Sequence, residues 1–313
     1  DALGYATTGG DGTNALTPTA TFDGAYTALI AGLTANNAKG VIANLPYVNT
    51  LPFFTTVPYN PLTSKVLGAG NVAVGDATIG ALNTQLYGPL KQALTAFGAG
   101  DRINLLSTTA ANPLLIKDES LTDLSAQLTG AFTAGGMPAA QASAMGAIFG
   151  KARQATATDL VLLTTQSAIG AAPTALDSGI GAAPTAPLDK FGITYPLQDK
   201  HVLIPTELAE IKAATDAFNI TIKAAADAKG LAFVDAKAIM TQLVSTAGFS
   251  SNGFTLKSAF VTGGAFSLDG VHPSPRGYAL IANEFIKAIN AKYGSTLKAV
   301  DLSKYRVLFP ATL

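Results

Sequence analysis

Two short apolar runs, each preceded by a helical pattern and a stop, constrain the fold of this chain more than any other feature of its sequence. The first run is GVIANLP at residues 40–46, which ends at a proline, and the second is LAFVD at residues 231–235. Both are typical of strands buried in a parallel sheet. The order helix, stop, buried strand is that of α/β proteins, so the sequence predicts an α/β fold.

Apolar residues at helical spacing predict the helices next to these strands. The helix before the first strand ends near Asn36, Asn37 and Gly40. Its expected stripe is Phe22, Tyr26, Leu29, Ile30 and Leu33. The helix before the second strand is expected to begin at a Thr206 cap and to end at Gly230.

The C-terminal part predicts two further helices. One covers about Lys237–Thr246, and the other begins with Ser274 as N-cap and Pro275 as the first helical residue. The packing stripe expected for this last helix is Tyr278, Ile281, Ala282, Phe285 and Ile289.

The middle of the chain has a different character. Helical patterns are expected at about residues 79–97, 121–132 and 138–149. The heptapeptide IGAAPTA occurs at 169–175 and again at 180–186, in a stretch rich in proline and glycine that indicates a duplicated loop. The predicted organisation is a core formed by residues 1–61 and 201–313, with residues 62–200 as a mainly helical insertion or cap.

Composition excludes several classes of function. There is no cysteine, which removes thiolate nucleophiles and cysteine-ligated metals, and only His201 and His272 could supply imidazole ligands. An all-oxygen calcium site stays open. Twenty Lys and Arg balance twenty Asp and Glu, so no basic field attracts nucleic acid. No apolar stretch reaches the ~20 residues of a membrane span, and the low charge favours an exported protein.

Asp269 and His272 are the residues whose spacing indicates chemistry. An aspartate three residues ahead of a histidine, on a loop that leads into a helix, lets the carboxylate reach one imidazole nitrogen while the other faces outward as a base. A histidine near a helix start can also be purely structural, so the spacing alone leaves both interpretations open.

The segment DGVHPSPRGY, residues 269–278, closely resembles the last conserved block of the SGNH or GDSL serine hydrolases. The resemblance implies a three-layer α/β/α, flavodoxin-like fold with a parallel sheet, a serine acyl-enzyme mechanism and no cofactor. The N-terminus, the run LPYVNTLPFFTTVPYNP and the YPLQDK segment are similar to the large GDSL-type lipoproteins of Bacteroidetes. That likeness implies an exported protein, at the cell surface, anchored to the outer membrane or periplasmic.

The family uses four sequence blocks, and the last is the complete one in this chain. By the resemblance His272 is the general base and Asp269 its orienting carboxylate. Asp1 looks like the final residue of the third block, which would place the nucleophilic serine and the oxyanion residues in a segment upstream of residue 1. VAVGDATIG, residues 72–80, imitates the serine block but has Ala77 at the position of the nucleophile. Ser178 lacks the strand–turn–helix setting of a nucleophile elbow.

Three further residues are weaker candidates for substrate binding. Asn44 ends the first strand, at the edge where α/β sheets place ligands, although an asparagine there more often forms a turn. Phe53 and Phe54 could line an acyl pocket or could simply pack. His201 has no partner at a useful spacing.

The sequence therefore predicts an esterase or lipase that acts on carboxylic esters of small molecules, lipids or glycans. The alternative is a non-catalytic accessory subunit that uses the hydrolase fold to bind an outer-membrane protein. No nucleic-acid partner is expected.

Overall fold

A computed structural model describes residues 1–307 and divides the chain into two compact units. Unit 1 contains Asp1–Thr56 and Glu207–Leu313, and unit 2 contains Val57–Thr206. The boundaries predicted from the sequence, after residues 61 and 200, lie near these positions, and the assignment of the two parts as hydrolase core and insertion stays a prediction.

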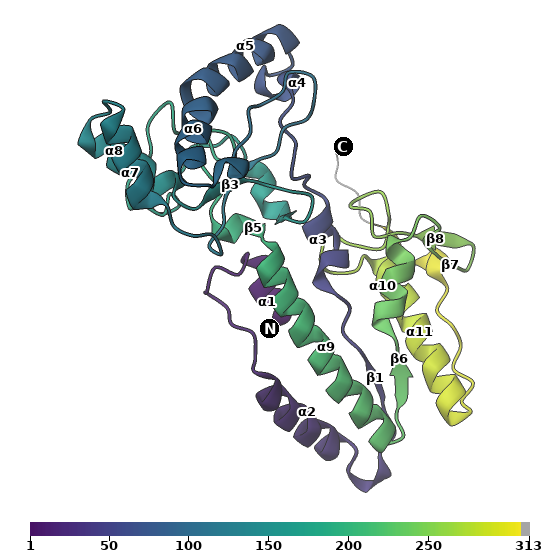
Figure 1. The fold of residues 1–313 in the computed structure, drawn as a ribbon. Coiled ribbons are helices and arrows are strands. Elements are labelled where there is room, and N and C mark those ends of the chain that lie inside the picture. The colour runs from purple at the N-terminus through teal and green to yellow at the C-terminus, as the bar shows by residue number, and fades with distance from the viewer. Residues whose placement is uncertain (308–313) are drawn as a thin grey trace. The chain divides into compact units, whose positions relative to one another are not determined.

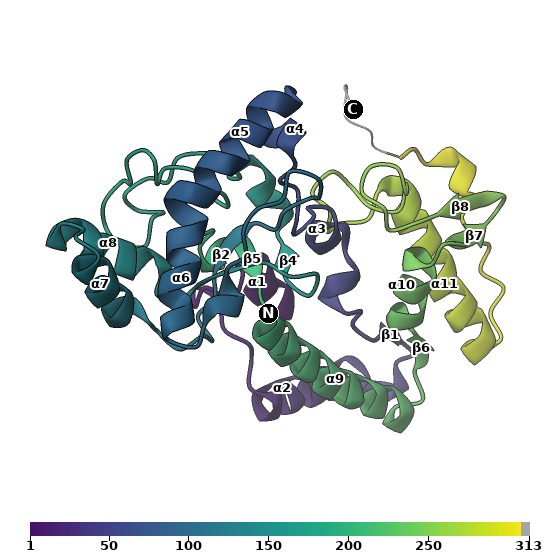
Figure 2. The same cartoon turned by 45° about the horizontal axis from the view of Figure 1, so that its top comes forward.

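Unit 1 is built around a parallel pair of strands, β1 (Val41–Ala43) and β6 (Ala232–Val234). Both strands fall inside the two apolar runs, and their parallel pairing confirms the α/β pattern. In Figures 1 and 2 the pair lies between α9 (Pro205–Ala228) and α11 (Pro275–Tyr293). The Tyr293 hydroxyl donates to Gly40 O at 2.7 Å and accepts from Ala232 N at 3.3 Å, so α11 is tied to the start of both strands.

The other elements of unit 1 surround this pair. The ring of Phe22 in α2 stacks on that of Phe218 in α9 at 4.1 Å. Asn219 of α9 accepts from Leu45 N at 2.7 Å and donates to Leu45 O at 2.9 Å, which secures the chain that leaves β1. The remaining helices and strands are α1 (Ala2–Thr7), α2 (Thr19–Leu33), α3 (Pro52–Thr55), α10 (Ala236–Val244), β7 (Phe249–Ser251) and β8 (Phe254–Leu256).

Three details of unit 1 differ from the predictions. All three residues of β1 are only half-buried, because β1 pairs along one edge in the described part of the chain. The helix expected to begin at a Thr206 cap begins at Pro205, whose fixed φ suits the first helical turn. Leu29 and Leu33 of the α2 stripe are 56% and 65% exposed, since α2 meets α9 through Phe22.

The start of α11 is as predicted, and four of the five residues of its predicted packing stripe are at least half-buried. Ser274 caps the helix and accepts from Gly277 N at 3.0 Å. Tyr278, expected in the packing stripe, is 54% exposed, whereas the polar Asn283 is buried. Asn283 donates to Val300 O at 2.9 Å and accepts from Val300 N at 2.6 Å. These bonds to a distant segment satisfy the amide and set the face that α11 buries.

Unit 2 combines helices with two short antiparallel strand pairs. The predicted helix at 79–97 is part of a longer run that starts with an Asn71 cap and contains a π-helical turn. VAVGDATIG lies inside its first helix, so Ala77 has no strand–turn–helix setting. Both IGAAPTA copies lie in irregular chain, as predicted.

The helices and strands of unit 2 are α4 (Ser64–Leu67), α5 (Val72–Leu82), η3 (Asn83–Tyr87), α6 (Gly88–Ala96), α7 (Ser125–Ala134), α8 (Ala139–Phe149), β2 (Leu115–Lys117) with β3 (Ala152–Gln154), and β4 (Leu160–Val161) with β5 (Val202–Leu203). None of the helices in residues 1–307 is long and apolar enough to span a membrane.

A buried ion cluster centred on Arg153 stabilises unit 2. The guanidinium donates to Asp118 at 2.5 Å and to both oxygens of Asp159 at 2.6 and 2.7 Å. The side chain of Asp159 is fully buried and also accepts from Thr156 N at 2.7 Å. Every charge in the cluster therefore faces an opposite charge, and loss of the arginine would leave two carboxylates without a counter-charge.

His201 is an uncharged, structural histidine in unit 2. Its Nδ1 accepts a hydrogen bond from Gln198 N at 3.1 Å, and its ring packs edge-on against Phe191 at 4.9 Å. Burial, with a smaller contribution from the charge of Lys200, lowers the pKa of His201 to about 4. The protonated form is thus disfavoured in the folded chain.

Substitution of Arg153 by methionine is expected to destabilise unit 2 by about 3–5 kcal/mol, because it leaves Asp159 buried without a counter-charge. Urea unfolding followed by circular dichroism measures the change. Lys200→Ala is the control, since it breaks an exposed ion pair with Asp177 and should leave the midpoint unchanged. Equal effects of the two substitutions would contradict this assignment.

The lowered pKa of His201 predicts a pH dependence of stability. The unfolded chain takes up a proton on this histidine near pH 6.5, whereas the folded chain does so only near pH 4. The free energy of unfolding is therefore highest above pH 6.5, the pKa of His201 in the unfolded chain. It falls by roughly 3 kcal/mol as the pH drops from 6.5 to about 4. His201→Asn should remove this loss from unit 2, whereas His272→Asn, at the other histidine, should keep it. Unfolding midpoints at both ends of this pH range provide the test, and an unchanged slope in His201→Asn would be the contrary result.

Candidate active site

The segment from Phe266 to Pro273 forms a closed loop ahead of α11. An antiparallel bridge joins Phe266 and Pro273 at its base, and Ser267 N donates to His272 O at 2.8 Å. Gly270 turns the chain at φ 71°, a left-handed conformation that a side chain would strain. The backbone therefore holds Asp269 and His272 on one tight turn.

The Asp269 carboxylate is the centre of this loop. Its Oδ1 accepts from Ser267 Oγ at 2.6 Å and from the backbone N–H groups of Val271 and His272 at 2.9 Å each. Its Oδ2 lies 2.7 Å from His272 Nδ1. Partial burial opposes ionisation, but these hydrogen bonds outweigh it and lower the pKa of Asp269 well below its usual value. Asp269 is thus a fixed anion at neutral pH.

This anion determines which nitrogen of His272 carries the proton. An ionised carboxylate can only accept hydrogen bonds, so the short contact requires a proton on Nδ1. In the neutral imidazole Nε2 then has the free lone pair. The His272 side chain is 68% exposed. Within residues 1–307 its ring is hydrogen bonded to the Asp269 carboxylate and to no hydroxyl group. The arrangement is that of an oriented base with an accessible nitrogen.

The start of α11 holds the loop in place. Ser274 is completely buried, and its Oγ donates to Gly264 O at 2.7 Å while capping the helix. Gly277 lies so close to the preceding segment that a Cβ there would be 2.1 Å from Ala265 O. Arg276 donates to Tyr305 O at 2.8 Å and covers the Phe254 ring at 4.3 Å.

Phe53 and Phe54, the two aromatic residues predicted to bind substrate, belong to a segment that contacts the Asp269–His272 loop through its backbone. Phe53 N, in the first turn of α3, donates to Gly270 O at 3.0 Å. Both rings are buried, that of Phe54 to 1% exposure, and they pack edge to face at 5.0 Å. The role of Phe53 and Phe54 in substrate binding stays a prediction, while the backbone of Phe53 supports the turn that carries Asp269 and His272.

Asn44 joins the end of β1 to the start of α10. Its Nδ2 donates to Asp235 Oδ1 at 2.8 Å, and its Oδ1 accepts from Lys237 N at 3.1 Å. The same oxygen of Asp235 caps α10 through Ala238 N at 3.0 Å. These contacts give Asn44 a structural role, and its role toward substrate stays a prediction.

A small apolar cavity of about 170 Å³ lies next to the loop. Val271 and Pro273, on either side of His272, form part of its wall, and Met240 and Leu280 contribute from α10 and α11. Apolar side chains therefore border the backbone of the exposed base.

The groups that hold Asp269 and His272 in place were not predicted from the sequence. Ser267 stands two residues before Asp269, a spacing that in hindsight suits a hydroxyl bonded to that carboxylate. Gly277 and the backbone of Phe53 act through contacts with segments far along the chain, which local sequence does not reveal. Ser178, the other serine considered, is buried in unit 2 and donates to Ala175 O at 3.1 Å.

Comparison with known proteins agrees with this site. A family model described as GDSL-like Lipase/Acylhydrolase matches residues 142–285, a range that includes α9, β6, Asp269 and His272. The match supports the likeness to the SGNH/GDSL hydrolases that the DGVHPSPRGY segment predicted, and the α/β fold of that family agrees with the parallel strand pair of unit 1. No curated protein and no solved structure gives a match to the chain.

The close packing at Gly277 leads to a prediction about stability. Gly277→Ala should destabilise unit 1 by about 1–3 kcal/mol, because the new methyl group forces α11 away from Ala265. Gly24→Ala, in α2 with open space around its Cβ position, should instead be neutral or stabilise by up to about 1 kcal/mol. Denaturant unfolding of both variants gives the comparison, and a Gly277→Ala protein as stable as Gly24→Ala would refute the packing account.

Proposed function

We propose that this protein is an ester hydrolase of the SGNH/GDSL type in which His272 is the general base and Asp269 orients it. The observation that supports this most is the 2.7 Å contact between His272 Nδ1 and a carboxylate that three further donors hold in place. The match to a lipase and acylhydrolase family model supports carboxylic esters as the substrate class.

In the proposed mechanism the nucleophile is a serine in a segment of the intact protein upstream of residue 1, as the order of the family blocks implies. His272 Nε2 takes the serine proton while the oxygen attacks the ester carbonyl. The resulting imidazolium is stabilised by Asp269 and returns the proton to the departing alcohol. Water then enters, gives its proton to the same nitrogen and releases the acid from the acyl-enzyme.

Several finer features belong to the same proposal. The complete fold is a three-layer α/β/α sandwich, and the parallel pair β1–β6 between α9 and α11 is part of its sheet. The protein is exported and acts at the cell surface, on the outer membrane or in the periplasm. The ester is that of a small molecule, a lipid or a glycan.

The test compares Asp269→Asn with wild type in the hydrolysis of 4-nitrophenyl butyrate by the intact protein. The asparagine amide can donate to Nδ1 and so favours the wrong tautomer. We expect kcat to fall by about 10⁴-fold, the loss that the same change causes in the serine protease triad, with KM little altered. Asp227→Asn, at an exposed ion pair with Lys223, is the matched control and should keep full activity.

A fluorophosphonate probe separates the two candidate functions. Labelling of a serine in the intact wild-type protein supports the enzyme. Absence of both labelling and turnover in wild type would favour the non-catalytic accessory subunit, whereas an Asp269→Asn protein as active as wild type would refute the assigned roles.

A further inference from the structure

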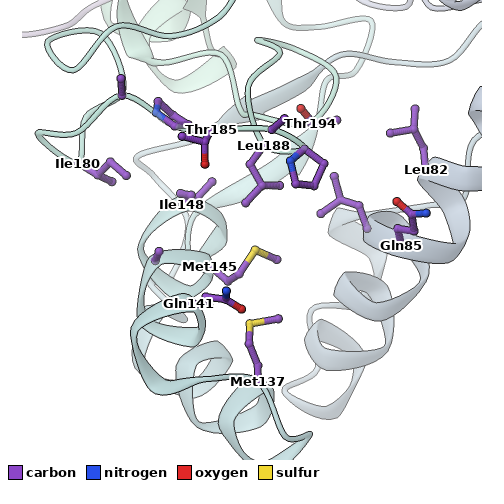
Figure 3. A pocket seen from close by; sticks show the side chains of 16 residues that line it. Leu82, Gln85, Met137, Gln141, Met145, Ile148, Ile180, Thr185, Leu188 and Thr194 are labelled. Carbon is purple, nitrogen blue, oxygen red and sulfur yellow. The ribbon is translucent and has the colours of Figure 1, made fainter.

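Unit 2 has a cavity of about 490 Å³, which is larger than the one beside the loop of Asp269 and His272 in unit 1. Figure 3 shows helices on two sides of it, with Met145 on one side and Leu82 on the other, and a loop that carries Ile180 and Leu188 across it. Sites for small organic ligands have volumes of about 300–1,000 Å³. The cavity is therefore large enough for a ligand, and all its lining residues belong to unit 2.

The wall of this cavity is mostly apolar and carries no charge. No Asp, Glu, Lys, Arg or His is among the residues that line it, all of which the structure describes. An ionic ligand would lose hydration there without gaining a counter-charge. The chemistry of the wall thus selects an uncharged ligand.

The apolar side chains are aliphatic and adaptable. Two of the three methionines of the chain, Met137 and Met145, face into the cavity (Figure 3). Thioether side chains adjust their shape to a flexible ligand. No aromatic ring lines the cavity, so the described wall offers a planar ligand no stacking partner. These features fit a flexible hydrocarbon chain better than a ring system.

The polar residues in the wall are Gln85, Gln141, Thr185 and Thr194, of which the two glutamines carry side-chain amides. Gln85 and Gln141 come from helices on opposite sides of the cavity (Figure 3). Both glutamines are exposed, and within residues 1–307 neither side-chain amide is engaged in a hydrogen bond to the protein. Each can both donate and accept, which suits the carbonyl and hydroxyl groups of a neutral ester head.

We propose that this cavity binds a single unbranched acyl chain with an uncharged polar head, such as a monoacylglycerol. The chain lies along Met137, Met145 and Leu82, and the head is hydrogen bonded to Gln85 and Gln141. The proposal stands apart from the hydrolase function, because it depends only on residues of unit 2 and on binding.

The test measures the binding of 1-monolauroylglycerol, below its micelle concentration, by titration calorimetry. Ala144 and Ala140 are both exposed on α8, one turn apart, but Ala144 lines the cavity and Ala140 does not. Ala144→Trp should weaken binding at least about tenfold by filling the space, and Ala140→Trp should bind like wild type. Since the chain has no tryptophan, each indole also reports its own surroundings, and that of Ala144→Trp should emit at shorter wavelength.

Two further arms complete the test. Leu188→Trp narrows the cavity from the loop and should weaken binding in the same way, independently of α8. Laurate, ionised at mildly alkaline pH, should bind wild type at least about tenfold more weakly than the neutral ester. No binding by wild type, equal affinities of Ala144→Trp and Ala140→Trp, or equal affinities of laurate and the ester would each overturn the proposal.

Discussion

The hydrogen bond between Asp269 and His272 is the contact on which the account of this site depends. A carboxylate that also served as a proton donor, or that turned away, would leave the imidazole free to adopt either tautomer. Three donors to the other carboxylate oxygen prevent this by keeping Asp269 ionised and oriented. Two of these donors are backbone N–H groups of the same turn, so the folding of the loop itself prepares the base.

Packing behind the loop makes that turn rigid. Ser274 connects the start of α11 to Gly264, Gly277 brings the helix against Ala265, and Phe53 N supports the turn at Gly270. An exposed imidazole would otherwise sample many positions at little cost. Here the exposed ring is carried by backbone that buried contacts hold on several sides, which is what a preorganised base requires.

Local rules predicted the parts of the structure that local forces determine. The two strand runs, the cap at Ser274 and the pairing of Asp269 with His272 depend on neighbours in sequence and were found. The stripe predicted for α11 was wrong at Tyr278, which is exposed, and it did not include Asn283. Asn283 is buried through hydrogen bonds to Val300, a distant residue that helical periodicity does not reveal. The family resemblance followed from one short segment, whereas the supporting contacts of the site required the folded chain. The substrate roles of Asn44, Phe53 and Phe54 stay predictions.

The most direct measurement of the central claim is the tautomer of each histidine, from long-range ¹H–¹⁵N correlation spectra at alkaline pH. His272 should carry its proton on Nδ1, bonded to Asp269, and His201 on Nε2, because its Nδ1 accepts from Gln198 N. With two histidines in the chain, the His201→Asn spectrum assigns both. A His272 with its proton on Nε2 would contradict the account, since that nitrogen could then accept no proton from a nucleophile.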